Sequence, residues 1–482
     1  MDEHRRKFLD FAFANGLKVF EDSQDDRSLK SGRISPWFLN VGEFNTGRTM
    51  VQLSEAYAQT ILEARIEVDT LYGIPEKGVG LVGPVASELA RLGKDVGWFF
   101  DRKLPKDHGE ATGKSDFDLT KIIVGRVPKE GEAIGQLDDV FTAGNAKYEA
   151  RERLDSWGKF SYPLLAIALD RQEVGIDGGN SIEKYEKTTG TKVVSVVRAT
   201  DVSDYLKEQL RVAPDTDKEA ISRKIERLSN YLRVYGTDEA RRHVGKLEQS
   251  IFERDRSVIP ACDVESIEEF EEIVKQTANI EGIGGYKIGF ELGLTHSLPK
   301  IVEVARKHTN KPIIYDHQKA ATDIPDTAKN FARTMKKAGV DAVILFPQAG
   351  PETERAWIHQ AIDQGIKVIV GGRMTHPGYS VSEGGWITDE GALEMYRIAA
   401  RIGIKDFVVP GNKPEVIKQI KNVVESEDVN NASYSAPGFV AQGGAISDGA
   451  RVAGNRFNAI VGRGIYRATD KRVAAIEHTR HL

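Results

Sequence analysis

The second half of the chain repeats one pattern eight times, and this repetition constrains the fold more than any other feature. Short apolar runs rich in β-branched residues alternate with longer stretches that favour helices. A parallel sheet with this many β/α units in a little over 200 residues is typical of a (β/α)8 TIM barrel, in which chemistry collects at the C-terminal ends of the strands. The runs are residues 257–264, 285–290, 311–318, 341–347, 367–374, 406–411, 431–438 and 458–464.

The first half also alternates strands and helices, but with fewer units. Its apolar runs predict an open parallel sheet covered by helices on both faces, a second α/β fold. Residues 212–256 break the pattern, because they are highly charged, helix-prone and poor in strand formers. We therefore expect a first domain at residues 1–210, a helical linker at 211–255 and a barrel at 256–482. The first-half runs are residues 70–74, 95–101, 133–140, 164–170 and 192–199.

Composition narrows the class of protein. With 482 residues, 40% hydrophobic content and a net charge of −5, the chain is typical of a globular protein and offers no general case for nucleic-acid binding. No apolar run approaches the roughly 20 residues that span a bilayer, and we expect no signal peptide and no membrane partner. One cysteine, Cys262, rules out an intrachain disulfide framework. We expect a cytoplasmic enzyme.

Residues 136–146, "QLDDVFTAGNA", combine an apolar strand end, two aspartates and a Thr/Gly turn that opens a helix. Backbone N–H groups in such a turn suit a phosphate. The adjacent Asp138 and Asp139 suit the two hydroxyls of a ribose. An acidic turn with a helix cap is the alternative for the aspartates alone, but the whole pattern is typical of phosphoribosyltransferases, which bind 5-phosphoribosyl-1-pyrophosphate (PRPP).

Other polar segments of the first half carry side chains suited to the same substrates. Residues 29–40 offer a lysine and an aromatic pair that could flank a planar base, and Arg171 follows a buried strand, where it suits a carboxylate. Residues 101–114 form a basic, glycine-ended segment, either a mobile loop or one that closes on a pyrophosphate. The residues singled out in these segments are Lys30, Trp37, Phe38, Lys77, Arg102, Lys103, Lys106, His108 and Arg171.

These segments, in this order, resemble orotate phosphoribosyltransferase over residues 1–208. The resemblance implies transfer of ribose 5-phosphate from Mg²⁺–PRPP to orotate, with no magnesium ligand assigned to a side chain. It implies that Lys106 is the catalytic cation of a closing loop and that Asp138 and Asp139 face the ribose. It implies that orotate is held by Lys30, Phe38, Thr142 and Arg171, and the pyrophosphate by Arg102, Lys103, Lys106 and His108.

In the barrel half, Lys319 lies between two aspartates, Asp316 and Asp323, just where a buried strand emerges. Flanking carboxylates favour the ammonium form of a lysine. An alternating chain of Lys287, Asp316, Lys319 and Asp323 could therefore stabilise a carbanion and deliver a proton to it without a metal or organic cofactor. Taken alone, the cluster also fits a surface ion-pair network.

Polar residues at other strand ends favour the catalytic interpretation. Thr375 follows the fifth strand run, and Gln442 and Arg463 follow the seventh and eighth, where this type of barrel usually binds phosphate. The set resembles orotidine 5′-phosphate decarboxylase over residues 256–482. That resemblance implies that Lys319 donates the proton beside Asp316, and that Asp323 enters a partner subunit's site. It implies ribose contacts for Asp263 and Lys287, a pyrimidine contact for Thr375 and a phosphate site at Gln442 and Arg463.

The acidic-lysine motif departs from the family. The common spacing is D-x-K-x-x-D, whereas this chain has D-x-x-K-x-x-x-D. Residues three apart on a strand point to opposite faces, so Asp316 and Lys319 can meet only if the strand ends in a bulge or turn. In another register His317 takes the position of the aspartate. We favour Asp316, because it ends the apolar run.

The two resemblances share a metabolite, since the first family makes orotidine 5′-phosphate and the second consumes it. Together they imply a bifunctional enzyme of pyrimidine biosynthesis, with Mg²⁺ for the transferase half and no cofactor for the decarboxylase half. They also imply a homodimer or a higher homo-oligomer. The alternative is a PRPP-sensing regulatory module fused to a sister sugar-phosphate decarboxylase barrel.

Overall fold

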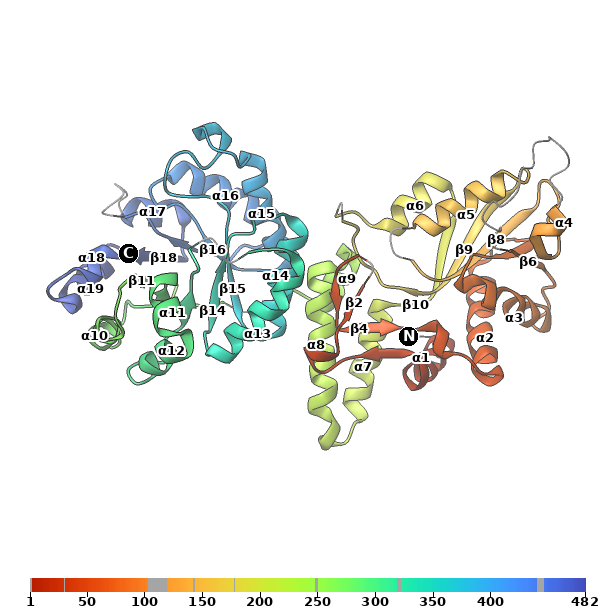
Figure 1. Cartoon of the computed structure of the whole chain (residues 1–482), viewed down its shortest axis with the longest axis horizontal. Coiled ribbons are helices and arrows are strands. Elements are labelled where there is room, and N and C mark those ends of the chain that lie inside the picture. The colour runs from red at the N-terminus through yellow and green to blue at the C-terminus, as the bar shows by residue number, and fades with distance from the viewer. Residues whose placement is uncertain are drawn as a thin grey trace. The chain divides into compact units, whose positions relative to one another are not determined.

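The chain folds into two compact units, shown in Figure 1. The first comprises Met1–Arg27 and Ser35–Val244, and the second Ser28–Ile34 and Gly245–Leu482. The structure, a computed structural model, describes residues 2–29, 31–102, 119–141, 144–176, 178–247, 250–318, 322–439 and 446–482.

The first unit is built on a six-stranded sheet with the strand order β10-β9-β8-β5-β6-β7. All neighbours are parallel except β7, which pairs antiparallel with β6 at one edge. The predicted open parallel sheet is confirmed, and each of its five apolar runs holds one strand. The strands of this unit and the β2–β3 ribbon are β1 (Leu17–Val19), β2 (Arg27–Ser28), β3 (Ile34–Ser35), β4 (Trp37–Leu39), β5 (Thr70–Gly73), β6 (Gly97–Asp101), β7 (Ile123–Gly125), β8 (Ala133–Val140), β9 (Ser161–Asp170) and β10 (Lys192–Arg198).

Helices cover both faces of this sheet, with α2 and α3 on one face and α5 and α6 on the other (Figure 1). On the second face Ala150 and Leu154 of α5 and Tyr185 of α6 pack onto the apolar side chains of the strands. The helices are α1 (Glu3–Asn15), α2 (Gly47–Ala64), α3 (Lys77–Arg91), α4 (Leu119–Ile122), α5 (Asn145–Asp155), α6 (Ser181–Thr189), α7 (Ala199–Val212), α8 (Asp215–Tyr235) and α9 (Asp238–Val244), with 3-10 turns η1 (Ser23–Asp25) and η2 (Val41–Glu43).

The charged helices α8 and α9 belong to the first unit. Arg227 of α8 is fully buried, and its guanidinium donates to both oxygens of Asp26, at 2.8 and 2.9 Å, and to the carbonyl of Phe20 at 3.1 Å. An arginine is rarely buried without such a partner. The helices expected for residues 211–255 therefore pack onto the first unit. None of the helices in the described ranges is long and apolar enough to cross a membrane.

The second unit contains a closed barrel of eight parallel strands, which confirms the predicted (β/α)8 fold. Each of the eight repeated runs holds one strand, although the strands are shorter than the runs. They are β11 (Arg256–Cys262), β12 (Tyr286–Ile288), β13 (Ile313–Tyr315), β14 (Ala342–Leu345), β15 (Lys367–Gly371), β16 (Asp406–Val408), β17 (Ser433–Ala436) and β18 (Phe457–Val461).

Apolar side chains fill the barrel, among them Ile259, Ile314, Ile344, Ile369 and Ile460, each from a different strand. Helices follow the strands around the outside. They are α10 (Ile267–Thr277), α11 (Phe290–His296), α12 (Leu298–Arg306), α13 (Ala328–Ala338), α14 (Pro351–Asp363), α15 (Asp389–Ile402), α16 (Pro414–Ser426), α17 (Ile446–Ala453), α18 (Arg463–Tyr466) and α19 (Lys471–Thr479), with 3-10 turns η3 (Pro325–Thr327) and η4 (Val381–Glu383).

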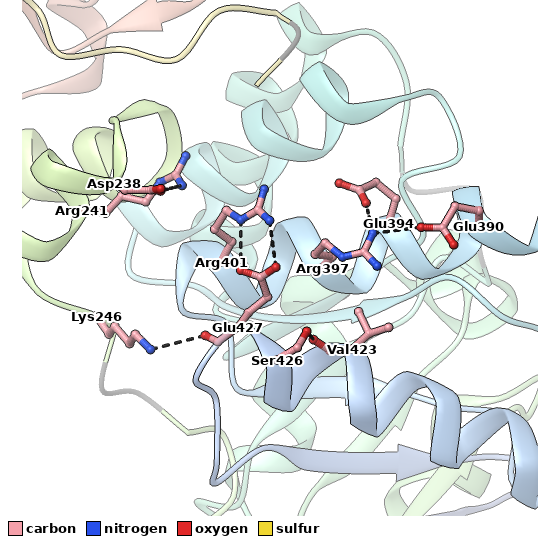
Figure 2. A network of polar contacts seen from close by, with 10 residues as sticks. All are labelled: Asp238, Arg241, Lys246, Glu390, Glu394, Arg397, Arg401, Val423, Ser426 and Glu427. Atoms are coloured by element: carbon pink, nitrogen blue, oxygen red, sulfur yellow. Dashed lines mark hydrogen bonds and ion pairs between the residues drawn. The ribbon is translucent and has the colours of Figure 1, made fainter. Parts of the chain in front are cut away.

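The segment that enters the barrel is fastened to the end of α16, as Figure 2 shows. The Lys246 ammonium donates to the carbonyls of Glu427 and Asp428, at 3.4 and 2.9 Å. Arg401 of α15 makes two bonds to the Glu427 carboxylate, at 3.1 and 2.8 Å. These exposed contacts each contribute little to stability.

Asp406, at the start of β16, is a buried carboxylate that lies away from the ends of the strands where catalysis is expected. One of its oxygens accepts the N–H of Ile251 at 3.1 Å. Burial raises the pKa of Asp406 from 3.8 to about 6, and the nearby Arg456 and Lys367 only partly oppose this effect. The ionised form is therefore unfavourable in the folded barrel.

We expect Asp406→Asn to stabilise the barrel at neutral pH. Because the folded pKa exceeds the unfolded one, the wild type loses stability as pH rises from about 4 to about 6, and the loss persists above that range. A shift of this size corresponds to a gain on the order of 2 kcal/mol for the variant. Calorimetric melting from about pH 4 to about pH 8 should show a gain that shrinks toward the acid end. The matched control is Asp255→Asn, at an exposed carboxylate near the same Arg456.

Candidate functional sites

A buried lysine lies between two carboxylates at the mouth of the barrel. Lys287 belongs to β12, and Asp263 and Asp316 directly follow the neighbouring strands β11 and β13. The Lys287 ammonium is 3.4 Å from Asp263 Oδ1 and 3.2 Å from Asp316 Oδ2. Lys287 and Asp316 are 6% and 2% exposed. Lys287 and Asp316, two members of the predicted alternating set of charged residues, are therefore in contact.

The two carboxylates decide the charge of Lys287. Burial by itself would lower the pKa of this lysine, but attraction to Asp316 and then to Asp263 outweighs burial, so the pKa lies above its usual value. The lysine is therefore a fixed positive charge. A fixed cation in a water-poor cavity interacts strongly with developing negative charge.

A tight turn after β13 accommodates the unusual spacing of the acidic-lysine motif. The Asp316 side chain accepts the N–H of Gln318 at 2.9 Å, and Gln318 has a left-handed backbone conformation with φ of 52°. Gly289 leaves room for the Asp263 carboxylate, because a Cβ at that position would lie 2.8 Å from Asp263 Oδ1. The strand thus ends in a turn, as the three-residue spacing requires.

The other members of the motif lie differently. His317 turns away from Lys287 and hydrogen-bonds through Nδ1 to the hydroxyl of Tyr315, whose ring it meets edge-on. Asp323 is exposed. Lys319 lies outside the described residues. Asp316 therefore contacts Lys287 and His317 contacts Tyr315, while the choice between them as the neighbour of Lys319 stays a prediction.

The loop after β15, residues 372–388, carries Thr375 and is tied to its surroundings. Asn412, from the loop after β16, donates to the Thr375 carbonyl at 3.1 Å. Lys413 pairs with Glu383 in the middle of the loop. Arg373 pairs with Asp389 at 2.6 Å where the loop ends. Thr375 is half-buried and so held near the barrel mouth.

Arg463 begins α18 directly after β18, and its side chain is exposed. This position, at the C-terminal end of the last strand, agrees with the place expected for a phosphate ligand. Gln442, the other residue of that expectation, lies outside the described residues.

In the first unit the two aspartates form the end of β8. Asp138 is buried and Asp139 is half-buried. Asp138 Oδ1 accepts the N–H of Asp139, and Asp139 Oδ1 accepts the N–H of Val140, at 2.8 and 2.7 Å. Helix α5 begins shortly afterwards, preceded by Gly144 with φ of 82°. The strand, acidic pair and helix therefore follow one another as expected.

The turn that carries Lys77 packs tightly against this strand end. A Cβ at Gly73 would lie 2.4 Å from the Gly78 carbonyl oxygen, and a Cβ at Gly78 would lie 2.2 Å from the Leu137 carbonyl oxygen. Only glycine permits this approach. Lys77 itself is exposed at the first position of α3. The glycines thus bring the Lys77 turn beside the β8 aspartates.

Arg171 follows β9 and is 6% exposed. Its guanidinium donates to Glu173 at 2.7 Å, to Ser35 Oγ at 2.9 Å and to the carbonyl of Trp37 at 3.5 Å. It also lies 4.2 Å from the centre of the Trp37 ring. Arg171 therefore joins the end of β9 to β4, whose Phe38 is 38% exposed.

The remaining predicted residues of this half are less informative. Arg102 is exposed, and its backbone N–H donates to the Ile122 carbonyl at 2.9 Å. Five predicted residues lie outside the described ones, namely Lys30, Lys103, Lys106, His108 and Thr142.

Several residues at these sites were not predicted. Lys147 pairs with Asp138 at 2.6 Å, and the Tyr57 hydroxyl donates to the Asp138 carbonyl at 2.7 Å. In the barrel, Gln318 and Asn412 were also missed. Of these residues, only Gln318 had a signal in the sequence, namely the extra residue in the D-x-x-K spacing. Within the described ranges, no group of three or more His, Cys, Asp or Glu residues could hold a metal ion.

Comparisons with known proteins cover both halves. Residues 256–477 match the family model for the Orotidine 5′-phosphate decarboxylase / HUMPS family. The chain is 38% identical over 207 residues to an orotate phosphoribosyltransferase of Marinobacter nauticus, covering 43% of this chain and 90% of the relative. It is 36% identical over 238 residues to one of Methylococcus capsulatus, covering 49% and 100%. A solved orotidine 5′-monophosphate decarboxylase of Methanocaldococcus jannaschii, complexed with the inhibitor BMP, is 27% identical with a TM-score of 0.42, covering 47% of this chain and 98% of that one.

The chain belongs to the orotate phosphoribosyltransferase family, and its second half carries an orotidine 5′-phosphate decarboxylase family domain. Both family resemblances seen in the sequence are confirmed. One polypeptide therefore joins two domains whose families act on consecutive metabolites of pyrimidine biosynthesis.

Proposed function

We propose that this chain converts orotate and PRPP to orotidine 5′-phosphate in its first domain and decarboxylates that product to uridine 5′-monophosphate in its second. The family membership of the two halves supports both activities. The observation that carries the second activity is the buried Lys287 held between Asp263 and Asp316 at the barrel mouth. We assign the transferase to residues 1–210 and the decarboxylase to residues 256–482, joined by residues 211–255.

In the transferase step, the N1 nitrogen of orotate forms a bond to C1 of the ribose as the bond from C1 to the pyrophosphate oxygen breaks. Pyrophosphate leaves, and the proton of N1 passes to solvent. Mg²⁺ enters with PRPP as part of the substrate. Asp138 and Asp139 would accept hydrogen bonds from the ribose hydroxyls, and Lys106 would neutralise the leaving pyrophosphate. Pyrophosphate contacts are assigned to Arg102, Lys103, Lys106 and His108, and orotate contacts to Lys30, Phe38, Thr142 and Arg171. Lys77 is a further substrate-binding residue.

In the decarboxylation step, the bond between C6 and the carboxylate breaks, CO2 leaves, and the electron pair stays at C6. Lys319 then delivers a proton to C6. The carboxylate of Asp316 would face the substrate's carboxylate, and its contact with the Lys287 ammonium supports a fixed position for it. This step needs no metal or organic cofactor.

The rest of the nucleotide would be held around the mouth of the barrel. Asp263 and Lys287 would contact the ribose, Thr375 the pyrimidine, and Gln442 and Arg463 the phosphate. A firmly bound phosphate, remote from C6, supplies binding energy for the transition state. We also propose a cytoplasmic homodimer or higher homo-oligomer, in which Asp323 reaches the partner subunit's site. The exposed position of Asp323 supports that role.

Two assays on the wild-type chain test this proposal. Orotate should be lost only when PRPP and Mg²⁺ are both present. Orotidine 5′-phosphate should lose its characteristic absorbance in a chelating buffer. A PRPP sensor would bind PRPP without consuming orotate, and a sugar-phosphate barrel would leave orotidine 5′-phosphate intact, so either result would contradict the corresponding half of the proposal.

Replacing one lysine in each half should separate the activities. We expect Lys319→Ala to slow decarboxylation by at least about 100-fold, because it removes the proton donor, while orotate is still converted to its nucleotide. We expect Lys106→Ala to slow orotate conversion and to spare decarboxylation of added nucleotide. Both rates should be measured on each purified variant. Equal loss of both activities in either variant would contradict separate sites.

A further inference from the structure

A lysine that the proposed mechanism does not use lies buried beside the acidic pair of the transferase domain. Lys147, in the first turn of α5, is 5% exposed. Its ammonium is 2.6 Å from Asp138 Oδ2 and donates to the Val140 carbonyl at 2.7 Å. It also lies 5.6 Å from the centre of the Phe141 ring. All these contacts turn the ammonium toward the end of β8 and away from solvent.

Asp138 has few other means of staying charged. It is 5% exposed, and its neighbour Asp139 is another acid. Burial raises the pKa of Asp138, Lys147 lowers it, and Asp139 raises it again. Among the described residues, the titratable groups that face Asp138 are Lys147 from α5, Asp139 from β8 and the Tyr57 hydroxyl from α2. Only Lys147 is a cation.

The geometry also fixes where the Asp138 carboxylate points. Oδ2 is bound by Lys147 and Oδ1 by the Asp139 N–H. The Asp138 carboxylate therefore cannot rotate without breaking a short contact. Each carboxylate oxygen has two lone pairs and can still accept a second hydrogen bond. A carboxylate held in this way is preorganised for a hydroxyl donor.

We propose that Lys147 is a positioning residue of the transferase: it holds the Asp138 carboxylate in place and in its ionised form, ready to accept a hydrogen bond from a ribose hydroxyl of PRPP. Lys147 itself touches no substrate. This inference depends on the proposed function, because it takes the ribose contact of Asp138 from there. A lysine with a purely structural role would leave the pH dependence of PRPP use unchanged.

The test compares Lys147→Met, Lys147→Arg and Asp138→Asn in the full-length chain. We expect Lys147→Met to lower kcat/KM for PRPP at least about 10-fold near pH 7, since an unpaired buried acid takes up a proton. The acid limb of its pH profile should move up by about one unit or more, with activity recovering at higher pH. Lys147→Arg keeps the cation and should retain the wild-type acid limb. KM for orotate should change little.

A double-variant comparison isolates the pair. When Asp138 is already asparagine, adding Lys147→Met should cost no more than about 2-fold further, because the lysine then has no charge to hold. Lys187→Met, at an exposed lysine of α6, is the surface control and should match the wild type. Decarboxylation by each variant reports that the barrel has folded, and an unchanged KM for orotate reports that the transferase domain has folded.

A stability measurement separates failure of this inference from failure of the proposed function. In Lys147→Met the folded pKa of Asp138 should rise further above 3.8, so the variant should lose stability as pH rises and its melting temperature should fall further behind the wild type. If Lys147→Met shows this trend but the wild type shows no PRPP-dependent transfer, the proposed function fails and the positioning role of Lys147 fails with it. Lys147 is not a positioning residue if the wild type is active and Lys147→Met keeps the acid limb of the wild-type pH profile. The same conclusion follows if the losses of activity caused by Lys147→Met and Asp138→Asn multiply in the double variant.

Discussion

Lys287→Met is expected to abolish decarboxylation, by about 1,000-fold or more, while leaving orotate conversion intact. Methionine matches the length of the lysine stem but removes the charge. Asp316 and Asp263 would then lose their shared cation, and Asp316 would stay buried without the Lys287 charge. Breaking a buried pair in this way costs roughly 3–5 kcal/mol of folding free energy. A 1,000-fold loss of rate corresponds to about 4 kcal/mol of lost transition-state stabilisation, since each 1.4 kcal/mol is about tenfold. The measurement is turnover of added orotidine 5′-phosphate by the purified variant.

Lys311→Met is the matched control. Lys311 lies just before β13, at the opposite end of this strand from Asp316. Its ammonium donates to the carbonyls of Ile280 and Ile283, at 3.2 and 2.5 Å. Its loss should lower stability but spare turnover. Decarboxylation that survives in Lys287→Met would show that this cation is not part of the active site.

The same assay decides between the two neighbours of Lys319. Asp316→Asn should share the loss seen in Lys287→Met, because Asp316 contacts Lys287 directly. His317→Asn should keep most of the activity, because His317 bonds to Tyr315 instead. If Asp316→Asn keeps its activity and His317→Asn loses it, His317 takes the position of the family's aspartate.

Arg171→Met is expected to have the second-largest effect, on the other activity. It removes a buried guanidinium that holds Glu173, Ser35 and the Trp37 carbonyl. Glu173 would keep its bond from the Tyr231 hydroxyl but lose its cation. We expect orotate conversion to fall about 100- to 1,000-fold and the free energy of unfolding to fall by roughly 3 kcal/mol. Steady-state kinetics and denaturant unfolding measure the two effects.

A second substitution separates binding from stability. Arg171→Met combined with Glu173→Gln also removes the acid that paired with Arg171, so it should recover much of the lost stability without recovering orotate conversion. The Arg171→Lys variant should be more stable than Arg171→Met. Its lysine still lacks the planar guanidinium that binds a carboxylate through two hydrogen bonds. If the double variant regains orotate conversion, Arg171 serves only the fold.

Much of the architecture could be predicted from local sequence. Each strand of the barrel and each long parallel strand of the first sheet falls in one of the apolar runs, because a strand buried on both faces must be apolar throughout. The strands that were missed, such as β1, β7 and the β2–β3 ribbon, are two or three residues long. So short a strand shows no periodicity of its own, and these strands, unlike the equally short β12, β13 and β16, do not lie in one of the repeated apolar runs.

The candidate site was predictable where a polar residue follows an apolar run. Asp263 and Asp316 were identified in this way, and parallel strands bring such residues to one end of the barrel. Gln318 and Lys147 were missed for different reasons. Gln318 takes up an extra residue through a left-handed turn, and Lys147 lies in "NAKYEA", which has the composition of an exposed helix.

The sequence by itself determined two α/β folds, their order, their families and most of the side chains at the strand ends, because periodicity and local motifs depend on residues close together in the chain. Only the tertiary structure decided which charges meet. Lys287 lies 24 residues from Asp263 and 29 from Asp316, and these side chains touch because strand pairing closes the barrel. Whether a lysine such as Lys147 is buried or solvated likewise depends on the packing of its helix against a strand, since burial is a property of the folded surroundings.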